Sequence, residues 1–474
     1  MAYIFDPKKY DGFHPDILRK YDIRGRVGET LKVDDVFAAG LCFADLVQEQ
    51  GITTVAVCRD GRLSSPEFET VLMEAITSRG VNILQIGVGP TPLLYYVVKE
   101  IPSVGAGIMI TGSHNDARYN GLKMLLKDKP IWGEEIQGFR RRYHLLLTQE
   151  SIEKNGMIRS QEFYTPYIQR LLKGMTLSPT LKVVWDCGNG ATGPVVQSLV
   201  QHLPGQHILL YEKVDGTFPH HHPDPTVANN MKELREAVLR ENADVGIGFD
   251  GDGDRIGVIT RTGRLLLGDQ LMVLYGRDLL KKHPGATILV DVKTSRWVLE
   301  DLKHRGGEPR LCATGHSSIK AMMKETGALL AGELSGHIFF ADDYYGYDDA
   351  LYASLRLLNL LKEGSNLETL LSDMPLTYQT PEIGIACPDA VKFRVMENIK
   401  ARLQHDPDGQ LITLDGIRMD YADGWWLLRA SNTESILTAR AEALSAERLQ
   451  QFLEHLEEML ASENLKLPKG KLSG

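Results

Sequence analysis

The sequence has few cysteines and no long apolar run. Its five cysteines lie far apart and form no C-x-x-C pair, so neither a disulfide framework nor a cysteine-based zinc site is indicated. No stretch reaches the roughly 18 apolar residues that a membrane-spanning helix needs. The opening segment MAYIFDPKKYDGFHPD also contains no apolar core of signal-peptide length. These absences predict a cytoplasmic protein with no membrane partner.

An extended basic stripe is absent as well. The 53 Lys and Arg residues are outnumbered by 62 Asp and Glu residues, which gives a net charge of -9. No run of Lys and Arg forms the basic stripe that a nucleic-acid surface requires, so we expect no nucleic-acid partner. An anionic ligand must therefore bind in a local positive pocket.

Three segments share one pattern, in which a short apolar strand leads into a small or polar turn and then a helix. They are residues 52–76, 180–203 and 286–307, and each is followed by a second apolar strand. Continuous apolar runs are typical of strands buried on both faces, so the pattern predicts three related α/β domains with mixed, largely parallel sheets.

The last quarter of the chain has a different pattern. Strand-like stretches precede a helix that starts near Ala446, with Ser445 at the expected N-cap position. This pattern predicts a C-terminal α+β domain. We place the four domains at residues 1–158, 159–262, 263–376 and 377–474.

Three aspartates, Asp250, Asp252 and Asp254, alternate with glycines between two strand-like runs. Carboxylates at this spacing in a tight turn can converge on one hard cation. An EF-hand is excluded because its sixth and twelfth positions would be Arg255 and Arg261. The alternative is a solvated acidic turn, but the third aspartate and the following arginine favour a cation site.

Ser113 follows the apolar strand GAGIMI and enters a polar stretch that leads to Lys123. It has no G-x-S-x-G frame, because Thr111 and Asn115 occupy the outer positions, so a hydrolase nucleophile elbow is not indicated. A hydroxyl at the end of a buried strand is held rigidly beside an open loop, which suits a phosphoryl carrier. The alternative is an ordinary turn serine.

Other motifs offer ligand-binding groups. Glu333 and Ser335, two apart on extended backbone, would face the same way and suit neighbouring sugar hydroxyls, with His337 beside them. A capped turn is the alternative there. A second group combines a guanidinium, two hydroxyls and an amide, which suits phosphate; its members are Arg429, Ser431, Asn432 and Thr433.

Two further patterns give weaker evidence of a binding site than the motifs above. Gly188 to Gly193 forms a G-x-G-x-x-G run after a strand, with Glu212 near the distance expected of a ribose-binding acid. This pattern alone is weak support for a dinucleotide site, and it also fits a tight turn. The triplet His220 to His222 has metal-binding side chains, but neighbours on extended backbone point to opposite sides, which favours a loop role.

Taken in order, the motifs closely resemble the α-D-phosphohexomutases, specifically the bacterial phosphomannomutase/phosphoglucomutase branch. The resemblance runs nearly end to end and is carried by YDIRG, TGSHN, NGLK, DGDGDR, DVK, TGH, GELSGH and RASNT. It implies four domains around a central cleft and interconversion of hexose 1-phosphate and hexose 6-phosphate. The implied route uses a phosphoserine enzyme and a hexose 1,6-bisphosphate, which also serves as activator.

The resemblance assigns a role to each motif. Ser113 would carry the phosphoryl group, and Mg²⁺ would be held by its phosphate with the three aspartates. Lys123 and His337 are the acid/base candidates, with His114 and Arg255 also near the reacting atoms. The implied substrate-binding residues are Tyr21, Arg24, Lys293, His316, Glu333, Ser335, Arg429, Ser431, Asn432 and Thr433. We expect hexose phosphates as the binding partners and a monomer or weak dimer.

One departure and several alternatives stay open. The family loop commonly reads SHNP, whereas Asp116 stands here in place of proline and removes a rigid φ. Phosphoglucosamine mutase is the nearest rival activity, although YDIRG and GELSGH favour the mannose/glucose branch. A dinucleotide-dependent oxidoreductase and a non-catalytic sugar-phosphate binding protein are more remote. The sequence leaves mannose and glucose preference undecided.

Overall fold

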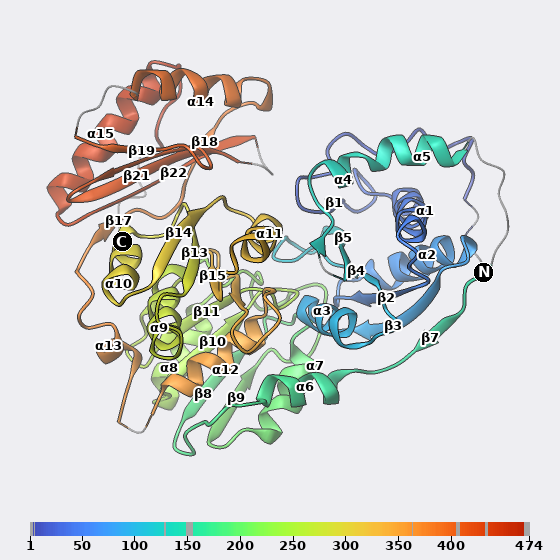
Figure 1. Ribbon diagram of the computed structural model, residues 1–474, viewed down its shortest axis with the longest axis horizontal. Coiled ribbons are helices and arrows are strands. Elements are labelled where there is room, and N and C mark those ends of the chain that lie inside the picture. Colours follow the sequence, from blue (N-terminus) through green and yellow to red (C-terminus); the bar gives the residue numbers. More distant parts are fainter. Residues whose placement is uncertain are drawn as a thin grey trace. The chain divides into compact units, whose positions relative to one another are not determined.

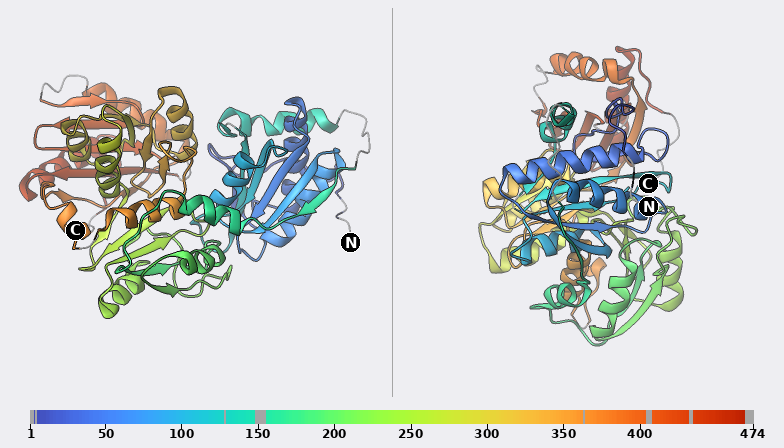
Figure 2. Two further views of the ribbon diagram at one scale, coloured as in Figure 1. Left: turned by 60° about the horizontal axis from the view of Figure 1, so that its bottom comes forward. Right: turned by 90° about the vertical axis from the view of Figure 1, so that its right-hand side faces the viewer.

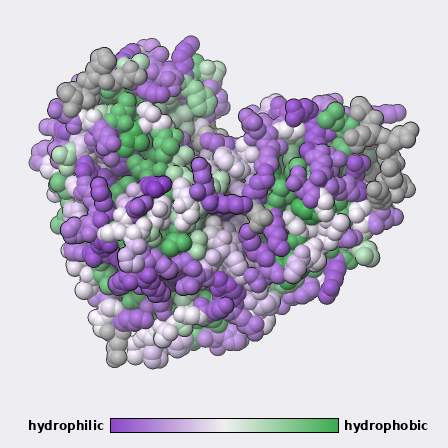
Figure 3. Space-filling view, in the orientation of Figure 1, coloured by the Kyte–Doolittle hydropathy of each residue, from purple (hydrophilic) through white to green (hydrophobic). Residues whose placement is uncertain are grey.

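The computed structural model describes residues 3, 5–127, 129–147, 155–362, 364–403, 408–431 and 435–468. They form two compact units. The first unit comprises Met1–Leu271 and Ser335–Leu370, and the second comprises Met272–Leu334 and Leu371–Gly474. Among the described residues, no helix has the length and apolarity to cross a membrane. Hydrophilic residues cover much of the face in Figure 3, and the hydrophobic areas there are smaller and interrupted.

The first sheet lies in the first unit and is mixed. Its strand order is β1 (Ile23–Arg26), β5 (Tyr119–Leu126), β4 (Ala106–Ile110), β2 (Thr54–Arg59), β3 (Asn82–Val88) and β7 (Ile158–Ser160), and β6 (Lys129–Pro130) pairs with β5. Strands β4, β2, β3 and β7 run parallel, whereas β5 is antiparallel to both of its neighbours. Figure 2 shows these blue and teal strands side by side.

Helices cover both faces of this sheet. Those with a shared core on one face are α1 (Val33–Glu49), α2 (Ser65–Ser78) and α5 (Phe139–Leu147), and α3 (Thr91–Glu100) lies on the other face (Figure 1). The short α4 (Glu134–Gln137) precedes α5. Because β2 and β4 are parallel neighbours, with Arg59 opposite Ile110, the loops that follow them leave the sheet at the same edge. One of these loops carries Ser113.

The second sheet also belongs to the first unit. Its strand order is β12 (Leu265–Leu266), β11 (Ile256–Thr260), β10 (Val245–Phe249), β8 (Lys182–Asp186) and β9 (Gln206–Leu210). The helices around it are α6 (Tyr164–Leu172), α7 (Gly193–Leu199), the 3-10 helix η1 (Val200–His202), α8 (Lys232–Glu241) and α12 (Ala350–Leu360). Strands β10 and β11 form an antiparallel hairpin, and the three aspartates occupy its turn.

The third group of strands is parallel, as predicted. In the second unit it contains β14 (Glu308–Cys312), β13 (Thr287–Asp291) and β15 (Leu330–Gly332), with α10 (Arg296–His304) and α11 (His316–Thr326). Helix α9 (Gly268–Lys282) contains the junction of the two units, while β16 (Ile338–Phe340) and α13 (Leu367–Leu370) belong to the first unit. The predicted third domain, residues 263–376, is therefore divided between the two units.

The last sheet is antiparallel. Its order is β17 (Tyr378–Gln379), β22 (Ile436–Ala443), β21 (Gly424–Ala430), β20 (Ile417–Tyr421) and β19 (Gln410–Ile412), and β18 (Ile383–Ala386) also pairs with β22. Helices α14 (Asp389–Leu403) and α15 (Ala446–Ala461) share one apolar core with it. Ser445 Oγ accepts a hydrogen bond from Arg448 N at 3.1 Å, which confirms the predicted N-cap.

Candidate active site

Ser113 lies directly after β4, and only 2% of it is exposed. Its backbone φ is 50°, a left-handed value that costs a non-glycine residue about 1–3 kcal/mol unless the surroundings hold it. The side-chain Oγ donates to Asp250 Oδ2 at 3.1 Å and lies 3.4 Å from His114 Nδ1. The structure thus brings together two predicted motifs that are 137 residues apart in the chain.

The three aspartates of the hairpin turn are buried and converge. Asp250, Asp252 and Asp254 each offer an oxygen within 4.8 Å of the others. Gly253, with φ of 72°, permits the tight turn. Burial and the charges of Asp254 and Asp252 raise the pKa of Asp250 well above its usual value. Within the described part of the chain, Asp252 Oδ1 is buried and has no hydrogen-bond partner.

These properties fit a divalent cation. Three carboxylates in one buried turn are costly without positive charge, and hard oxygen ligands suit Mg²⁺. The unsatisfied oxygen of Asp252 gives such an ion a ligand atom that no described protein donor occupies. The predicted metal ligands are therefore chemically suited to the predicted metal.

Lys123 extends from β5 toward this turn. Its Nζ donates to Asp252 Oδ2 at 2.7 Å and also to Asp254. Burial alone would lower the pKa of the Lys123 ammonium, but the two aspartates raise it above its usual value. Lys123 consequently carries a proton in this arrangement and neutralises part of the aspartate charge.

Two other predicted residues adjoin the aspartates. His337 Nε2 lies 3.3 Å from Asp254 Oδ1, and its Nδ1 lies 3.1 Å from Ser335 Oγ. Arg255 Nε is 3.9 Å from Asp250 Oδ2. Burial, together with the positive charges of Arg255 and other cations, holds the pKa of the nearby His114 imidazole well below its usual value.

The Tyr21 and Arg24 positions lie in the same unit. Arg24 pairs with Asp22 and donates to Asn115 Oδ1 at 2.7 Å, which ties it to the Ser113 loop. The Tyr21 ring stacks on Trp132 with a centroid separation of 6.4 Å. The first unit therefore holds the predicted nucleophile, the metal ligands and the acid/base candidates.

The second unit holds most of the other predicted binding residues that the structure describes, whereas Ser335 belongs to the first unit. Glu333 Oε1 accepts from Gly315 N at 2.7 Å, and Lys293 Nζ pairs with Glu382 at 3.3 Å. His316 begins α11, with its Nδ1 3.3 Å from Lys320 Nζ. These contacts place Glu333 and His316 at neighbouring turns of that unit.

The expected backbone between Glu333 and Ser335 was wrong. Residues 334–336 form a turn rather than an extended stretch, so alternation along a strand does not align the two side chains. Glu333 bonds to Gly315 N, whereas Ser335 faces His337. The glycine-rich sequence GELSGH bends the chain immediately after β15, because Gly336 adopts a φ of 91°.

Arg429 lies near the end of β21 with only 8% of its side chain exposed. One terminal nitrogen is 3.1 Å from Asp415 Oδ2, and its Nε is buried without a hydrogen-bond partner among the described residues. Ser431 is buried, and its carbonyl accepts from Lys392 Nζ at 2.7 Å. The predicted members Asn432 and Thr433 lie outside the described residues.

The G-x-G-x-x-G run supports the turn that carries the three aspartates instead of forming an open cradle. Ala191 N donates to Gly251 O at 2.9 Å, and a Cβ on Gly190 would lie 2.8 Å from that same oxygen. A Cβ on Gly193 would lie 1.9 Å from the carbonyl oxygen of Glu212. The glycines are explained by close backbone packing, so the dinucleotide interpretation has no structural support.

The histidine triplet also has a structural role. His221 Nε2 lies 2.9 Å from Asp186 Oδ2, and His220 Nδ1 lies 2.8 Å from Asn189 Oδ1. The His220 ring also stacks on Tyr211 at 3.8 Å. The three histidines are absent from the clusters of described residues that have metal-binding geometry. These contacts agree with the predicted loop role.

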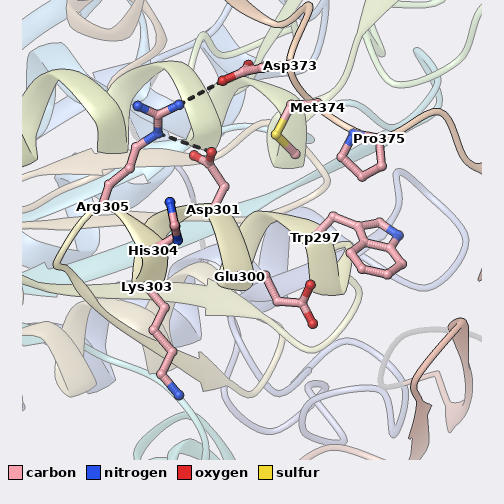
Figure 4. A pocket seen from close by; sticks show the side chains of 9 residues that line it. All are labelled: Trp297, Glu300, Asp301, Lys303, His304, Arg305, Asp373, Met374 and Pro375. Carbon is pink, nitrogen blue, oxygen red and sulfur yellow. Dashed lines mark hydrogen bonds and ion pairs between the residues drawn. The ribbon is translucent and has the colours of Figure 1, made fainter.

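A groove in the second unit lies along α10, away from the residues described above. Figure 4 shows Arg305 directed at both Asp301 and Asp373, with Trp297, Met374 and other residues along the groove. Arg305 Nε lies 3.1 Å from Asp301, and its terminal nitrogen lies 2.8 Å from Asp373. These ion pairs tie the segment before β17 to α10.

Sequence reasoning missed three residues that support the site. Thr91 Oγ1 donates to Asp252 Oδ2, and Thr91 N donates to Asp252 O at 2.8 Å. Asp60 and Arg62 contact the Ser113 loop from the turn after β2. The available signal was that Asp60 and Arg62, like Ser113, directly follow a buried apolar strand.

Comparisons with known proteins agree with this arrangement. Four phosphoglucomutase/phosphomannomutase domain models match in order: alpha/beta/alpha domain I at residues 15–144, domain II at 165–263, domain III at 267–378 and the C-terminal domain at 382–459. These ranges match the predicted number and order of domains.

Similar proteins span nearly the whole chain. A phosphomannomutase/phosphoglucomutase of Pseudomonas aeruginosa is 40% identical over 95% of this chain and 97% of its own length. A phosphoglucomutase of Neisseria meningitidis serogroup A is 39% identical over 92% and 95%. A solved phosphoglucomutase/phosphomannomutase family protein of Burkholderia thailandensis has a TM-score of 0.89 and 35% identity, covering 95% of this chain and 98% of that one. A probable phosphoglucosamine mutase of Methanopyrus kandleri is 31% identical over 91% and 94%.

Proposed function

The chain belongs to the phosphoglucomutase/phosphomannomutase family, and from this premise we propose that Ser113 is its phosphoryl carrier. The protein is a phosphohexomutase that interconverts hexose 1-phosphate and hexose 6-phosphate of mannose, glucose or both. The observation that carries the assignment is the 3.1 Å contact between Ser113 Oγ and Asp250 Oδ2. A hydroxyl beside a buried carboxylate cluster has the surroundings that a phosphoserine with a divalent cation requires.

We assign Mg²⁺ to Asp250, Asp252 and Asp254, together with the serine phosphate. When bound, this ion supplies charge stabilisation to the transferring phosphoryl group. The fit rests on three buried carboxylates and on the unsatisfied Oδ1 of Asp252, taken over the described residues. Two cationic side chains, Lys123 and Arg255, stand beside the same carboxylates.

The reaction uses two phosphoryl transfers through Ser113. In the first, a hydroxyl of the hexose phosphate attacks the phosphoserine, so a new O–P bond forms on the sugar and the Oγ–P bond breaks. The product is hexose 1,6-bisphosphate, and the hydroxyl proton passes to a protein base. In the second, Ser113 Oγ attacks the other phosphate of the reoriented bisphosphate, and the sugar oxygen leaves with a proton.

The proton-transfer roles follow from charge. Lys123 holds its proton between Asp252 and Asp254, so we assign it the role of cation and hydrogen-bond donor toward phosphoryl oxygens. His337 is then the candidate for the general base, because its imidazole lies beside Asp254 and Ser335. Assigning the base to His337 leaves Lys123 free to stabilise negative charge in both half-reactions.

We assign binding of the sugar hydroxyls and of the phosphate that is not being transferred to several side chains. Glu333 and Ser335 would bind sugar hydroxyls, and Arg429 with Ser431 would bind the phosphate that is not being transferred. Lys293, His316, Tyr21 and Arg24 complete the assignment, together with Asn432 and Thr433. The buried Nε of Arg429, without a partner among the described residues, supports a role as a phosphate donor. Hydroxyl and phosphate contacts of this kind serve a bisphosphate in either orientation.

The substrate test is a comparison of initial rates. Mannose 1-phosphate, glucose 1-phosphate and glucosamine 1-phosphate are each supplied with Mg²⁺ and catalytic hexose 1,6-bisphosphate. We expect efficient turnover of the mannose substrate, the glucose substrate or both, and a kcat/KM at least tenfold lower for glucosamine 1-phosphate. A preference for glucosamine 1-phosphate would instead indicate that the protein is a phosphoglucosamine mutase, the activity for which the Methanopyrus kandleri relative is named. No turnover of any of the three substrates would refute the proposed function.

A further inference from the structure

A buried arginine lies beneath the loop that carries Ser113. Arg62 belongs to the turn after β2, and its side chain has no exposed surface. Its Nε donates to Asp60 Oδ2 at 3.0 Å. Its two terminal nitrogens donate to four carbonyl oxygens of the loop: Ser113 at 2.7 Å, Asn115 at 2.6 Å, Asp116 at 2.5 Å and Tyr119 at 2.9 Å. All five guanidinium N–H donors are therefore used.

Asp60 completes this contact from the other side. Its Oδ2 accepts from Thr111 Oγ1 at 2.8 Å and from Gly112 N at 3.3 Å, the two residues before Ser113. Its Oδ1 accepts from Arg62 N at 3.0 Å and from Ser65 Oγ at 2.7 Å. One carboxylate thus fixes the end of β4 and orients the guanidinium that holds the loop beyond it.

The packing leaves the loop little freedom to shift. A Cβ on Gly112 would lie 2.5 Å from Arg62 Cζ and 2.8 Å from the Tyr119 carbonyl oxygen. The Phe218 ring, from the region of the second sheet, lies 5.1 Å from Arg62 Cζ. The guanidinium is consequently confined between the loop and an aromatic ring, and its planar fork sets where the four carbonyls can lie.

We propose that Asp60 and Arg62 are positioning residues that hold the Ser113 main chain at its left-handed φ and so keep Oγ in line for phosphoryl transfer. The inference rests on the proposed function, in which Ser113 is the carrier. The strained φ of 50° needs external support, and the Ser113 carbonyl is one of the four that Arg62 binds. The pair acts through the loop backbone and is assigned no contact with the substrate.

The consequence is a defect in chemistry without a matching defect in binding. Lysine carries three N–H donors on a single nitrogen and cannot reproduce the five donors of the planar fork. A misplacement of about 1 Å at a reacting atom commonly lowers a rate by about 100-fold. For Arg62→Lys we therefore expect kcat to fall roughly ten- to a hundred-fold, while KM stays within about threefold because the proposed substrate contacts are unchanged.

Arg59→Lys provides a matched control, because Arg59 ends β2, the strand that leads into the turn of Arg62. Arg59 donates to Glu69 Oε2 at 3.1 Å and to the Asp60 carbonyl at 3.2 Å, both outside the Ser113 loop. The two variants make the same chemical change, one at the buried Arg62 and the other at Arg59, whose side chain is 21% exposed. A loss that reflects only weaker packing of the turn should appear in both.

The experiment compares wild type, Arg62→Lys and Arg59→Lys by steady-state kinetics, thermal unfolding and the ³¹P NMR signal of the phosphorylated enzyme. We expect a kcat loss and a shifted or broadened phosphoserine signal in Arg62→Lys alone. Equal kinetics and equal spectra for the two variants, or a loss confined to KM, would overturn the inference. If Arg62→Lys does not fold, Asp60→Asn decides, because it keeps the shape of the carboxylate while weakening the same contacts.

The outcomes also separate this inference from the proposed function. If wild type carries no phosphoryl group on Ser113, the proposed function fails. If wild type is phosphorylated there and Arg62→Lys or Asp60→Asn keeps full kcat and an unchanged signal, only the positioning role fails.

Discussion

Lys123 Nζ lies 2.7 Å from Asp252 Oδ2, so an ammonium from β5 of the first sheet is bonded to the aspartate turn of the second. The same nitrogen bonds to Asp254. This contact connects the strand that follows the Ser113 loop to the predicted cation ligands. Lys123 therefore neutralises part of the aspartate charge and also holds the end of the first sheet that carries the Ser113 loop against the aspartate turn of the second sheet.

Replacing Lys123 by methionine tests this charge balance. Breaking a buried ion pair by removing one partner usually costs about 3–5 kcal/mol, because the remaining charge is left buried. We expect Lys123→Met to lose about that much free energy of unfolding in chelator, as measured by urea denaturation, and to lose nearly all activity. Lys129→Met is the control, since Lys129 pairs with Glu135 at an exposed site and should change stability by about 0–1 kcal/mol. Equal effects of the two variants would contradict the assignment.

The aspartate turn predicts dependence on a divalent cation. Exhaustive chelation should abolish turnover, and Mg²⁺ should restore it. Asp252→Asn removes one negative charge with little change in shape, so the variant should need at least tenfold more Mg²⁺ for half-maximal activity and should turn over more slowly. A Mg²⁺ titration of wild type and variant is the measurement. Undiminished activity after chelation would refute the metal assignment.

Arg429 is predicted to contribute mainly to substrate binding. Loss of a charge-assisted bidentate contact costs about 1.5–3 kcal/mol, so Arg429→Ala should lower kcat/KM roughly ten- to a hundred-fold. Arg429→Lys should recover only part of this loss, because an ammonium lacks the planar fork. The variant should also need more added hexose 1,6-bisphosphate, because the intermediate escapes more readily. If only kcat falls and KM and activator demand stay unchanged, Arg429 does not hold the phosphate.

A control on the same domain is Arg402→Ala. Arg402 pairs with Glu463 at 3.1 Å on the surface, with half of its side chain exposed. Its removal should leave kcat/KM within about twofold. A loss as large as that of Arg429→Ala would indicate a general effect on the domain.

The pair of His221 and Asp186 predicts a pH dependence of stability. Burial alone would lower the pKa of His221, but Asp186 raises it above its usual value of about 6.5. The group binds its proton more tightly when folded, so its stabilisation is fully present below about pH 6.5 and is lost as pH rises through the folded-state pKa. The wild type should therefore have a higher free energy of unfolding than His221→Gln. This difference should be about 1 kcal/mol larger at pH 5.5 than at pH 8.5.

Urea denaturation at the two pH values measures this difference, and His202→Gln is the control because His202 is exposed. The His202 variant should track wild type at both pH values. If the difference in free energy of unfolding between wild type and His221→Gln does not change with pH, or is larger at pH 8.5, the assigned charge on His221 is contradicted.

Apolar periodicity was sufficient to predict the secondary structure around the site. Strands β2, β8 and β13 and their following helices occur where the three repeated segments predicted them. The pattern was informative because buried parallel strands need continuous apolar runs, and Gly or polar residues mark their ends. The C-terminal α+β domain and the Ser445 cap were likewise predicted from local sequence, whereas the antiparallel order of its sheet was not.

Local patterns do not encode the long-range contacts. The Ser113–Asp250 and Lys123–Asp252 pairs join residues more than 100 positions apart. Local patterns predicted Ser113 and the aspartates separately, whereas the expectation that they lie together came from the family resemblance. The division of residues 263–376 between two units depends on tertiary packing that no local pattern shows. The turn at 334–336 was missed because it depends on the φ of 91° at Gly336, a conformation to which the alternation of an extended backbone does not apply.

Asp116 shows how a departure from the family sequence is compensated. Proline would restrict φ here, but Asp116 Oδ1 instead accepts from Arg118 N at 2.9 Å, and its Oδ2 accepts from the Arg118 guanidinium at 2.7 Å. The Arg118 side-chain bond lowers the pKa of Asp116 to about 2, so the carboxylate is charged at neutral pH. The Asp116 carbonyl also accepts from Arg62. Hydrogen bonds therefore replace the missing ring as the restraint on the loop.

The most direct test of the account is to follow the phosphoryl group on Ser113 through one turnover. The purified enzyme is phosphorylated with labelled hexose 1,6-bisphosphate, separated from it, and analysed by peptide mapping before and after addition of hexose 1-phosphate. We predict one label per chain on Ser113, its transfer to the sugar at least as fast as kcat, and neither label nor turnover in Ser113→Ala. Label on a different residue, label that stays on the protein during turnover, or full activity of Ser113→Ala would contradict the assignment of Ser113 as the phosphoryl carrier.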